Sequence, residues 1–350
     1  MKAAVLHGKG DLRYEEVPRP VPGPGEVLIR VRAAGICGSD VPRANDGTAH
    51  FFPIVLGHEF SGVIEELGEG VEGLMAGRKA TAAPLVPCMR CPDCQRGDYA
   101  LCPNYKFIGS RVNGAFADYV SVPAMGVVTF DDSVPFEQAA FFEPATIALH
   151  GLLHAGFTPG GDVAVLGAGT IGLYTLQWAR LLGARRAAAF DISRDRLELA
   201  LRLGADAAFD AGEESCLESA MCLTGGRGFG HVFETAGNNA TMAMAFELAS
   251  GRARVCFIGT AHADLKFPWK LFEKMNRKEF TLTGSWMSYS APFPGREWSW
   301  TAERFADGGL LFDPSLIHRS FPMEEAGEAF GLFRTPGAVK GKIMLVNPPE

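Results

Sequence analysis

Three residues from separate parts of the chain could hold a metal ion together. Cys37 stands in the segment GICGSD (35–40), His58 in GHE (57–59) and Glu143 in FEP (142–144). A thiolate, an imidazole and a carboxylate are ordinary zinc ligands, and three protein ligands leave one coordination position for a substrate oxygen. We therefore expect a catalytic zinc site that lowers the pKa of a hydroxyl group. Glu59 is expected to be a direct or intermittent ligand.

Each of these residues also has an ordinary structural interpretation. A single histidine such as His58 is most often a core residue, but its place in Gly-His-Glu after the Cys37 segment favours ligation. Glu143 could instead cap the helix that we expect from about Ala145, because acidic residues are common in a first helical turn. Both interpretations of Glu143 remain open from the sequence.

Four further cysteines form the compact motif Cys88-x2-Cys91-x2-Cys94-x7-Cys102. Four thiolates can close tetrahedrally on Zn²⁺ with no vacancy. Neighbouring prolines and a glycine predict an irregular lobe, at about residues 86–104, that the metal holds in shape. An iron–sulfur cluster and chance cysteines are the alternatives, and the spacing without redox companions favours structural zinc. The other three cysteines are expected to be small core residues: Cys216, Cys222 and Cys256.

A dinucleotide-binding pattern begins near residue 162. A short apolar segment (162–166) runs into GAGTIG (167–172), an apolar helical pattern follows through Leu182, and a second strand (187–190) ends at Asp191, nineteen residues beyond Gly172. Strand, glycine turn, helix, strand and acid are the setting that this fingerprint requires. The expected cofactor contacts are Gly167, Gly169, Thr170, Ile171, Gly172, Asp191, Arg196, Ile258 and Lys342. Asp191 favours NAD over NADP, although Arg194 and Arg196 leave some room for NADP.

The flanking patterns predict two domains. Short segments that alternate or end at Gly and Pro (26–32, 59–66 and 116–122) predict a β-rich, barrel-like domain. Six strands (162–166, 187–190, 207–209, 231–234, 254–258 and 280–283) alternate with helical stretches (193–203, 240–249 and 270–274), which predicts a doubly wound parallel sheet. Residues 286–298 have a loop-like composition, and the strand at 341–346 is expected to return to the first domain. The expected domains are 1–146 with 288–350, and 147–287.

Composition excludes several classes of protein. The 350 residues carry a net charge of −7 and no basic stripe, so nucleic acid is not an expected partner. No uninterrupted apolar run approaches the ~20 residues that cross a bilayer, so no membrane partner is expected. The N-terminal residues lack the apolar core of a signal peptide, and a cytoplasmic location is expected.

Together these motifs resemble the medium-chain zinc-dependent alcohol dehydrogenase family. The resemblance covers essentially the whole chain and implies a GroES-like catalytic domain, an inserted Rossmann domain, two zinc ions per chain, NAD, and a homodimer or homotetramer. Glu143 in place of a second cysteine resembles the polyol dehydrogenase branch. The segments CGSDVPR (37–43), FIGSR (107–111) and GSWMSYS (284–290) are similar to polyol-phosphate dehydrogenases, those acting on galactitol 1-phosphate among them. An unphosphorylated polyol or an amino alcohol (sorbitol, L-idonate or L-threonine) is the alternative substrate, and a non-catalytic NAD-binding protein is a third possibility.

The resemblance also suggests residues that meet the substrate. Arg43 and Arg111 are candidates for a substrate phosphate, because a guanidinium matches phosphate oxygens in bidentate fashion. Ser39 is expected to pass the hydroxyl proton towards solvent, but Pro42 stands where many relatives continue the relay with a histidine, and His50 is a possible substitute. Trp286 and Tyr289 are expected at the pocket wall. The alternatives are solvated arginines, a surface histidine and aromatic core residues.

Overall fold

The computed structural model describes residues 1–261, 263–335 and 337–348. The chain divides into two compact units: a β-rich unit of Met1–Glu143, Tyr289–Gly308 and Pro314–Glu350, and a parallel-sheet unit of Pro144–Ser288 and Gly309–Asp313. We expected the divisions after residues 146 and 287, with all later residues in the first domain. Among the described residues, no helix combines the length and apolarity that a bilayer crossing requires.

The β-rich unit is built on a seven-stranded sheet in the order β10-β6-β5-β3-β18-β17, with β9 also paired to β3. Its strands are β3 (Glu26–Gly35), β5 (Glu59–Leu67), β6 (Lys79–Ala82), β9 (Tyr119–Pro123), β10 (Val127–Thr129), β17 (Ile317–Pro322) and β18 (Lys342–Val346). A second sheet contains β2 (Asp11–Glu16), β1 (Lys2–Gly8) and β4 (Ile54–Val55). The strand expected at 116–122 begins only at Tyr119, because Ala117 forms a single bridge to Ala3 instead of continuing the ladder.

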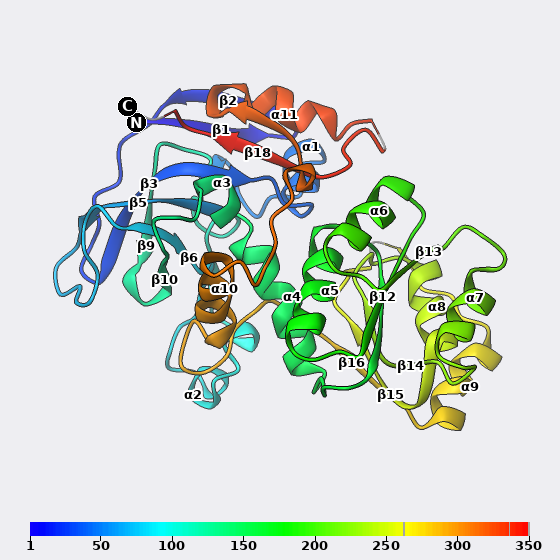
Figure 1. Ribbon diagram of the computed structural model, residues 1–350. Helices are drawn as coiled ribbons and strands as arrows, with labels where there is room; N and C mark the ends of the chain where they lie inside the picture. Colours follow the sequence, from blue (N-terminus) through cyan, green and yellow to red (C-terminus); the bar gives the residue numbers. More distant parts are fainter. Residues whose placement is uncertain (262, 336, 349–350) are drawn as a thin grey trace. The chain divides into compact units, whose positions relative to one another are not determined.

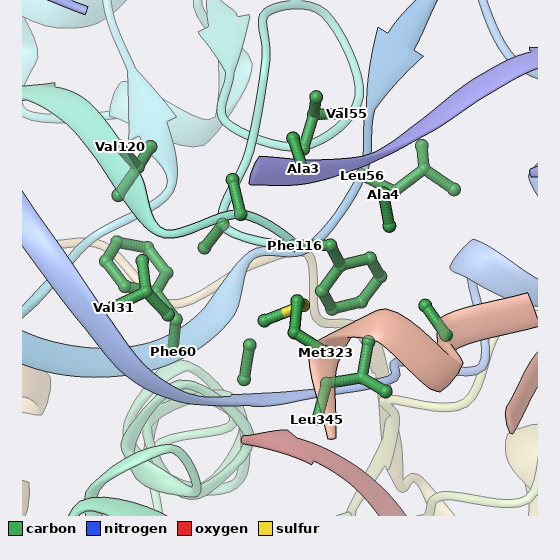
Figure 2. Close-up of a cluster of buried hydrophobic side chains, with 14 of the residues drawn as sticks. Ala3, Ala4, Val31, Val55, Leu56, Phe60, Phe116, Val120, Met323 and Leu345 are labelled. Atoms are coloured by element: carbon green, nitrogen blue, oxygen red, sulfur yellow. The ribbon is translucent and has the colours of Figure 1, made fainter. Parts of the chain in front are cut away.

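The core of this unit joins residues from both ends of the chain (Figure 2). Phe116 lies among Leu56, Ala4 and Met323, and Leu345 of β18 packs beside them. β18 pairs with β3 through Met344 opposite Gly35, so the tail does return to the first unit. The helices of the unit are short: α1 (Asp40–Asn45), α2 (Pro92–Arg96), α3 (Phe136–Ala139), α10 (Arg296–Ala306) and α11 (Ala326–Leu332).

Helix α10 shows that one expectation was wrong. Residues 286–298 looked loop-like, yet the helix already begins at Arg296. Trp298, Ala302 and Phe305 are buried at a spacing of four and three residues, which is the helical period. The prolines and glycine just before Arg296 hid this pattern in the sequence.

The parallel-sheet unit contains six parallel strands, as expected, and their order is β13-β12-β11-β14-β15-β16. They are β11 (Asp162–Leu166), β12 (Arg186–Asp191), β13 (Ala207–Asp210), β14 (Phe229–Glu234), β15 (Ala249–Phe257) and β16 (Thr281–Gly284). The helices are α4 (Phe142–His154), whose first two residues belong to the β-rich unit, α5 (Thr170–Leu181), α6 (Arg194–Arg202), α7 (Cys216–Leu223), α8 (Asn239–Leu248) and α9 (Trp269–Lys278). Helices α5 and α6 cover one face of the sheet, and α8 and α9 cover the other (Figure 1).

The unpaired cysteines of this unit differ in burial. Cys216 and Cys256 are buried as expected, but Cys222 is exposed, so its assignment to the core was wrong. Cys216 and Cys222 are six residues apart on α7, and six steps of about 100° turn a side chain to a different face of the helix.

Candidate active site

Three neighbouring strand ends bring the zinc-ligand candidates together in the β-rich unit. β3 runs antiparallel to both β5 and β18, so its end lies beside their beginnings: Gly35 is paired with Glu59 and with Met344. Cys37 follows β3 by two residues, His58 directly precedes β5, and Lys342 is the first residue of β18. One ligand atom each of Cys37, His58 and Glu59 lies within 4.8 Å of the others.

Two glycines make room for this arrangement. Gly57 has φ +97°, and a Cβ there would come within 2.5 Å of the Phe116 ring. A Cβ on Gly35 would lie 2.7 Å from Glu59 Oε2. Larger residues at these positions would displace His58 or Glu59.

The buried carboxylate of Asp40 lies beside two of the ligand candidates, Cys37 and His58. It accepts hydrogen bonds from the backbone N–H of Cys37 (3.2 Å) and from Arg43 Nη1 (3.1 Å). His58 Nδ1 lies 3.5 Å from Asp40 Oδ1, which is beyond hydrogen-bond length. Burial alone would raise the pKa of Asp40, but the His58 and Arg43 charges outweigh it and the pKa is lowered. The sequence prediction missed this residue, although an acid three positions after a ligand cysteine was a usable signal.

Lys342 forms an ion pair with Glu59. Its Nζ donates to Glu59 Oε1 (2.8 Å) and lies 2.5 Å from Oε2, and both side chains are buried. Burial would lower the pKa of Lys342, but the Glu59 carboxylate outweighs that effect and the pKa is raised. Lys342, which we expected to contact the cofactor, therefore belongs to the buried cluster of zinc-ligand candidates in the β-rich unit.

Glu143 is buried next to the same cluster but is not one of the three closely grouped residues. Burial raises its pKa to about 7, the charge of His58 opposes the shift, and the charge of Glu59 adds to it. The cluster therefore contains three buried acids: Asp40, Glu59 and Glu143. The basic side chains near them are Lys342 and Arg43.

A zinc ion fits this donor set. A divalent cation would balance the excess of buried acid and thiol groups. His58 Nδ1 is also a buried atom without a hydrogen-bond partner among the described residues. Both the donor types and this unpartnered nitrogen match a metal site.

Two of the substrate candidates, Ser39 and Arg43, form a hydrogen-bonded chain that begins at Cys37. Ser39 Oγ donates to Cys37 Sγ (3.3 Å), and Arg43 Nη1 donates to Ser39 Oγ (3.0 Å). Burial lowers the pKa of His50, and the positive charges of Arg111 and then Arg43 add to this effect, so the three side chains share one environment. Arg111 is exposed and its guanidinium lies 4.5 Å from the centre of the Tyr105 ring.

The two aromatic candidates lie in different settings. Tyr289 is buried in the β-rich unit, its hydroxyl accepts from the N–H of Leu85 (3.1 Å), and its ring stacks on Phe293. Trp286 belongs to the parallel-sheet unit and is 53% exposed. The structure therefore gives Tyr289 the role of a core residue.

The cysteine motif forms a second candidate zinc site. One sulfur atom each of Cys88, Cys91, Cys94 and Cys102 lies within 4.8 Å of the others, and none is in a disulfide. The Cys91–Cys94 sulfur distance is 3.5 Å, near the ~3.8 Å edge of a tetrahedron with Zn–S bonds of ~2.3 Å. Cys91 also caps α2, which is a helical turn within the lobe that we expected to be irregular.

In the parallel-sheet unit, the glycine turn has the close packing that a dinucleotide fold requires. Gly167 has φ +95°, and a Cβ on Gly172 would lie 1.8 Å from the Gly167 carbonyl oxygen. A Cβ on Gly169 would meet nothing within 4 Å, so this side of the turn is open to a ligand. Thr170 and Ile171 begin α5, whose N-terminus favours a pyrophosphate.

Asp191 ends β12 beside this turn. Its Oδ2 accepts from the N–H of Ala168 (2.8 Å) and its Oδ1 from the N–H of Ser193 (2.9 Å). Arg196 Nη1 lies 3.7 Å from Asp191 Oδ2. Ile258 follows β15, and its N–H donates to the carbonyl of Glu234 (2.8 Å). The open turn and the acid at the next strand end fit a dinucleotide.

A cavity of about 620 Å³ also lies in the β-rich unit, but it is not the candidate site. Its wall includes Val5, Pro53, Ile54 and Tyr119, and none of the zinc-ligand candidates lines it. Its lining is mixed, because the side chains of His7, Glu15 and Lys106 also line it.

Comparisons with known proteins agree with this arrangement. Residues 23–132 match the model of the alcohol dehydrogenase GroES-like domain, and residues 170–304 match that of the zinc-binding dehydrogenases.

The chain is 38% identical to galactitol 1-phosphate 5-dehydrogenase of Escherichia coli K12 over 347 residues, 99% of this chain and 100% of that one. It is 34% identical to sorbitol dehydrogenase of Bacillus subtilis over 264 residues, 74% of this chain and 75% of that one. The crystal structure of galactitol-1-phosphate dehydrogenase from Escherichia coli superposes with a TM-score of 0.94 and covers 99% of this chain and 100% of that one. The chain therefore belongs to the zinc-dependent medium-chain alcohol dehydrogenase family of oxidoreductases.

Proposed function

We propose that the protein oxidises a secondary hydroxyl of a polyol phosphate with NAD⁺, and that the substrate is galactitol 1-phosphate, converted to L-tagatose 6-phosphate. The observation that carries this proposal is the placement of Arg43 and Arg111 in one environment with His50, beside the candidate ligand Cys37. A relative that matches over its whole length is a galactitol 1-phosphate 5-dehydrogenase, which supports the same substrate.

In this proposal Cys37, His58 and Glu143 would hold the catalytic zinc. Glu59 is an alternative ligand, and its carboxylate is paired with Lys342. When bound, zinc supplies a Lewis acid for the substrate hydroxyl, and NAD⁺ supplies the hydride acceptor. The Asp40 carboxylate places a negative charge beside His58, and Ser39 receives the hydroxyl proton. The Ser39–Arg43 hydrogen bond cannot carry that proton further, because a guanidinium has no acceptor site. The proton must therefore leave Ser39 to solvent or through His50.

Arg111 is the better of the two phosphate candidates. Arg43 already donates to Ser39 and Asp40, whereas Arg111 makes no ion pair within the described part of the chain. A free guanidinium next to the site can form two parallel hydrogen bonds to a phosphate. Arg43 would contribute mainly its charge.

The proposed cofactor is NAD. Asp191 lies at the end of β12 with its carboxylate bonded to the glycine turn, where it can bind ribose hydroxyls and repel a 2′-phosphate. Two zinc ions per chain are proposed, the second in the cysteine lobe. A homodimer or homotetramer is proposed from the family resemblance, and light scattering of the purified protein measures it directly.

Substrate preference tests the proposal. NADH formation is followed on zinc-replete enzyme with galactitol 1-phosphate, galactitol, sorbitol 6-phosphate and sorbitol. Arg111→Ala should raise the KM for a phosphorylated substrate about tenfold or more and leave the KM for the free polyol nearly unchanged, because a charged hydrogen bond contributes about 1.5–3 kcal/mol. Arg13→Ala is the matched control, since Arg13 pairs with Asp11 on the exposed edge of the β-rich unit. Equal or faster turnover of free polyols would contradict the phosphate assignment.

An unphosphorylated polyol is the second candidate, because the chain also resembles a sorbitol dehydrogenase and Arg43 is already hydrogen bonded within the protein. A non-catalytic NAD-binding protein is disfavoured by the gathered Cys37, His58 and Glu59 set. Elemental analysis separates this last alternative: one zinc per chain, retained by the cysteine lobe, would support it.

A further inference from the structure

Thr235 follows β14 and lies directly against the glycine turn. Its hydroxyl is 3.0 Å from the carbonyl oxygen of Leu166 and 2.9 Å from that of Gly167. A Cβ on Gly167 would lie 3.0 Å from this hydroxyl, and one on Gly172 would lie 2.8 Å from it. The hydroxyl therefore occupies the space between the first and the last glycine of the turn.

The Gly167–Ala168 peptide is consequently held at both ends. Its carbonyl accepts from Thr235, and its N–H donates to Asp191 Oδ2 (2.8 Å). The C=O and N–H of a trans peptide point in opposite directions, so these two bonds fix the rotation of the peptide plane. The orientation of the following turn, and that of the Asp191 carboxylate, depend on this one plane.

Thr235 is itself anchored independently of any ligand. Its N–H donates to the carbonyl of Leu166 (2.8 Å). The next residues are fixed by the buried carboxylate of Glu234, whose Oε1 accepts from the N–H groups of Ala236 (2.9 Å) and Gly237 (2.8 Å). Thr235 therefore connects the hydrogen-bonded end of β14 to the glycine turn.

We propose that Thr235 is a positioning residue for the dinucleotide: its hydroxyl holds the Gly167–Ala168 peptide so that the turn and Asp191 are arranged for the ligand before it binds. This inference rests on the dinucleotide-dependent function proposed above. Preorganisation lowers the ordering cost of binding, so its loss weakens affinity even though Thr235 need not touch the ligand.

The test compares Thr235→Val, which has the same shape without the hydroxyl, with Thr235→Ser, which keeps it. Thr175→Val is the matched control, because Thr175 is a buried threonine on α5 whose hydroxyl donates to the carbonyl of Ile171 (2.8 Å) in the first turn of the helix and not to the Gly167–Ala168 peptide. NADH affinity is measured by fluorescence titration of the zinc-replete protein. Thr235→Val should raise the Kd for NADH about 3- to 10-fold, the range that one net hydrogen bond supplies. Thr235→Ser and Thr175→Val should stay within about twofold of the wild type.

Two further readouts separate positioning from general damage. In competition titrations, Thr235→Val should reduce the affinity for adenosine, which lacks the pyrophosphate, less than the affinity for NADH. Amide hydrogen exchange in residues 167–172 should become faster in that variant while exchange in β11 is unchanged. If Thr235→Val does not fold, Thr235→Ala takes its place.

The outcomes are distinct. Wild-type affinity in Thr235→Val, equal weakening by Thr235→Ser, or equal weakening by Thr175→Val would each overturn the inference while NADH binding by the wild type leaves the proposed function standing. Failure of the wild type to bind NADH or NADPH would instead refute the proposed function.

Discussion

His231 should make the parallel-sheet unit less stable in mildly acidic solution. It lies in β14 with its Nε2 3.1 Å from Thr158 Oγ1, its Nδ1 is buried without a hydrogen-bond partner among the described residues, and its ring packs against Phe157 at 4.7 Å. Burial lowers the pKa of His231 to about 4, and the nearby Arg254 charge adds to this effect. The folded protein therefore keeps this imidazole neutral.

The sign and size of the effect follow from proton linkage. Above about pH 6.5 the imidazole is neutral in both the folded and the unfolded chain, so it contributes no pH dependence. As the pH falls from 6.5 towards 4, His231 binds a proton in the unfolded chain but stays neutral in the folded chain. The free energy of unfolding therefore decreases. Between pH 7.5 and pH 5 the loss is about 2 kcal/mol.

Urea unfolding at pH 7.5 and pH 5 measures this loss, with Trp178, buried in the same unit, as the fluorescent reporter. His231→Gln keeps a neutral hydrogen-bonding group and should reduce the pH-dependent loss by about 2 kcal/mol relative to the wild type. His318→Gln, an exposed change on β17, should leave the loss unchanged. An unaltered pH dependence in His231→Gln would refute the argument that this histidine is held neutral.

Three further outcomes are expected. Lys342→Met should lower the Tm by about 6–20 °C, since breaking a buried ion pair costs about 3–5 kcal/mol, and the double variant Glu59→Gln/Lys342→Met should recover part of it; additive losses in thermal scans would contradict the pairing. Cys94→Ser should reduce the zinc content by one ion per chain and lower the Tm, and an unchanged metal count by elemental analysis would remove the lobe from the zinc assignment. Asp191→Ala should reduce the ratio of kcat/KM for NAD⁺ to that for NADP⁺ about 10- to 100-fold, and a constant ratio would show that Asp191 does not select the cofactor.

Much of the fold was predictable because its signals are local. Strands such as β11 and β12 carry a short apolar run, and the glycine turn between β11 and α5 has a spacing that few other structures require. The cysteine lobe was equally visible because its four cysteines lie within fifteen residues of sequence. In each case the interacting groups are neighbours in the chain.

The features that escaped prediction depend on residues far apart. Lys342 and Glu59 are separated by 283 positions, and only the pairing of β18 with β3 shows that they meet. Asp40 is close to Cys37 in sequence, but its burial against His58 follows from the sheet. The contact of the Thr235 hydroxyl with the carbonyl of Gly167 joins residues 68 positions apart, and no motif of the sequence indicates it.

The position of β18 also bears on how the protein is made. Cys37, His58 and Glu59 leave the ribosome early, whereas Lys342 emerges only after the entire parallel-sheet unit has been synthesised. That inserted unit has all six strands in one continuous stretch and can fold while translation continues. The β-rich unit lacks strand β18 until translation is almost complete. The Lys342–Glu59 ion pair beside the candidate zinc ligands can thus form only at the last stage of chain growth, and a truncation before β18 should leave a folded parallel-sheet unit attached to a β-rich unit without that pair.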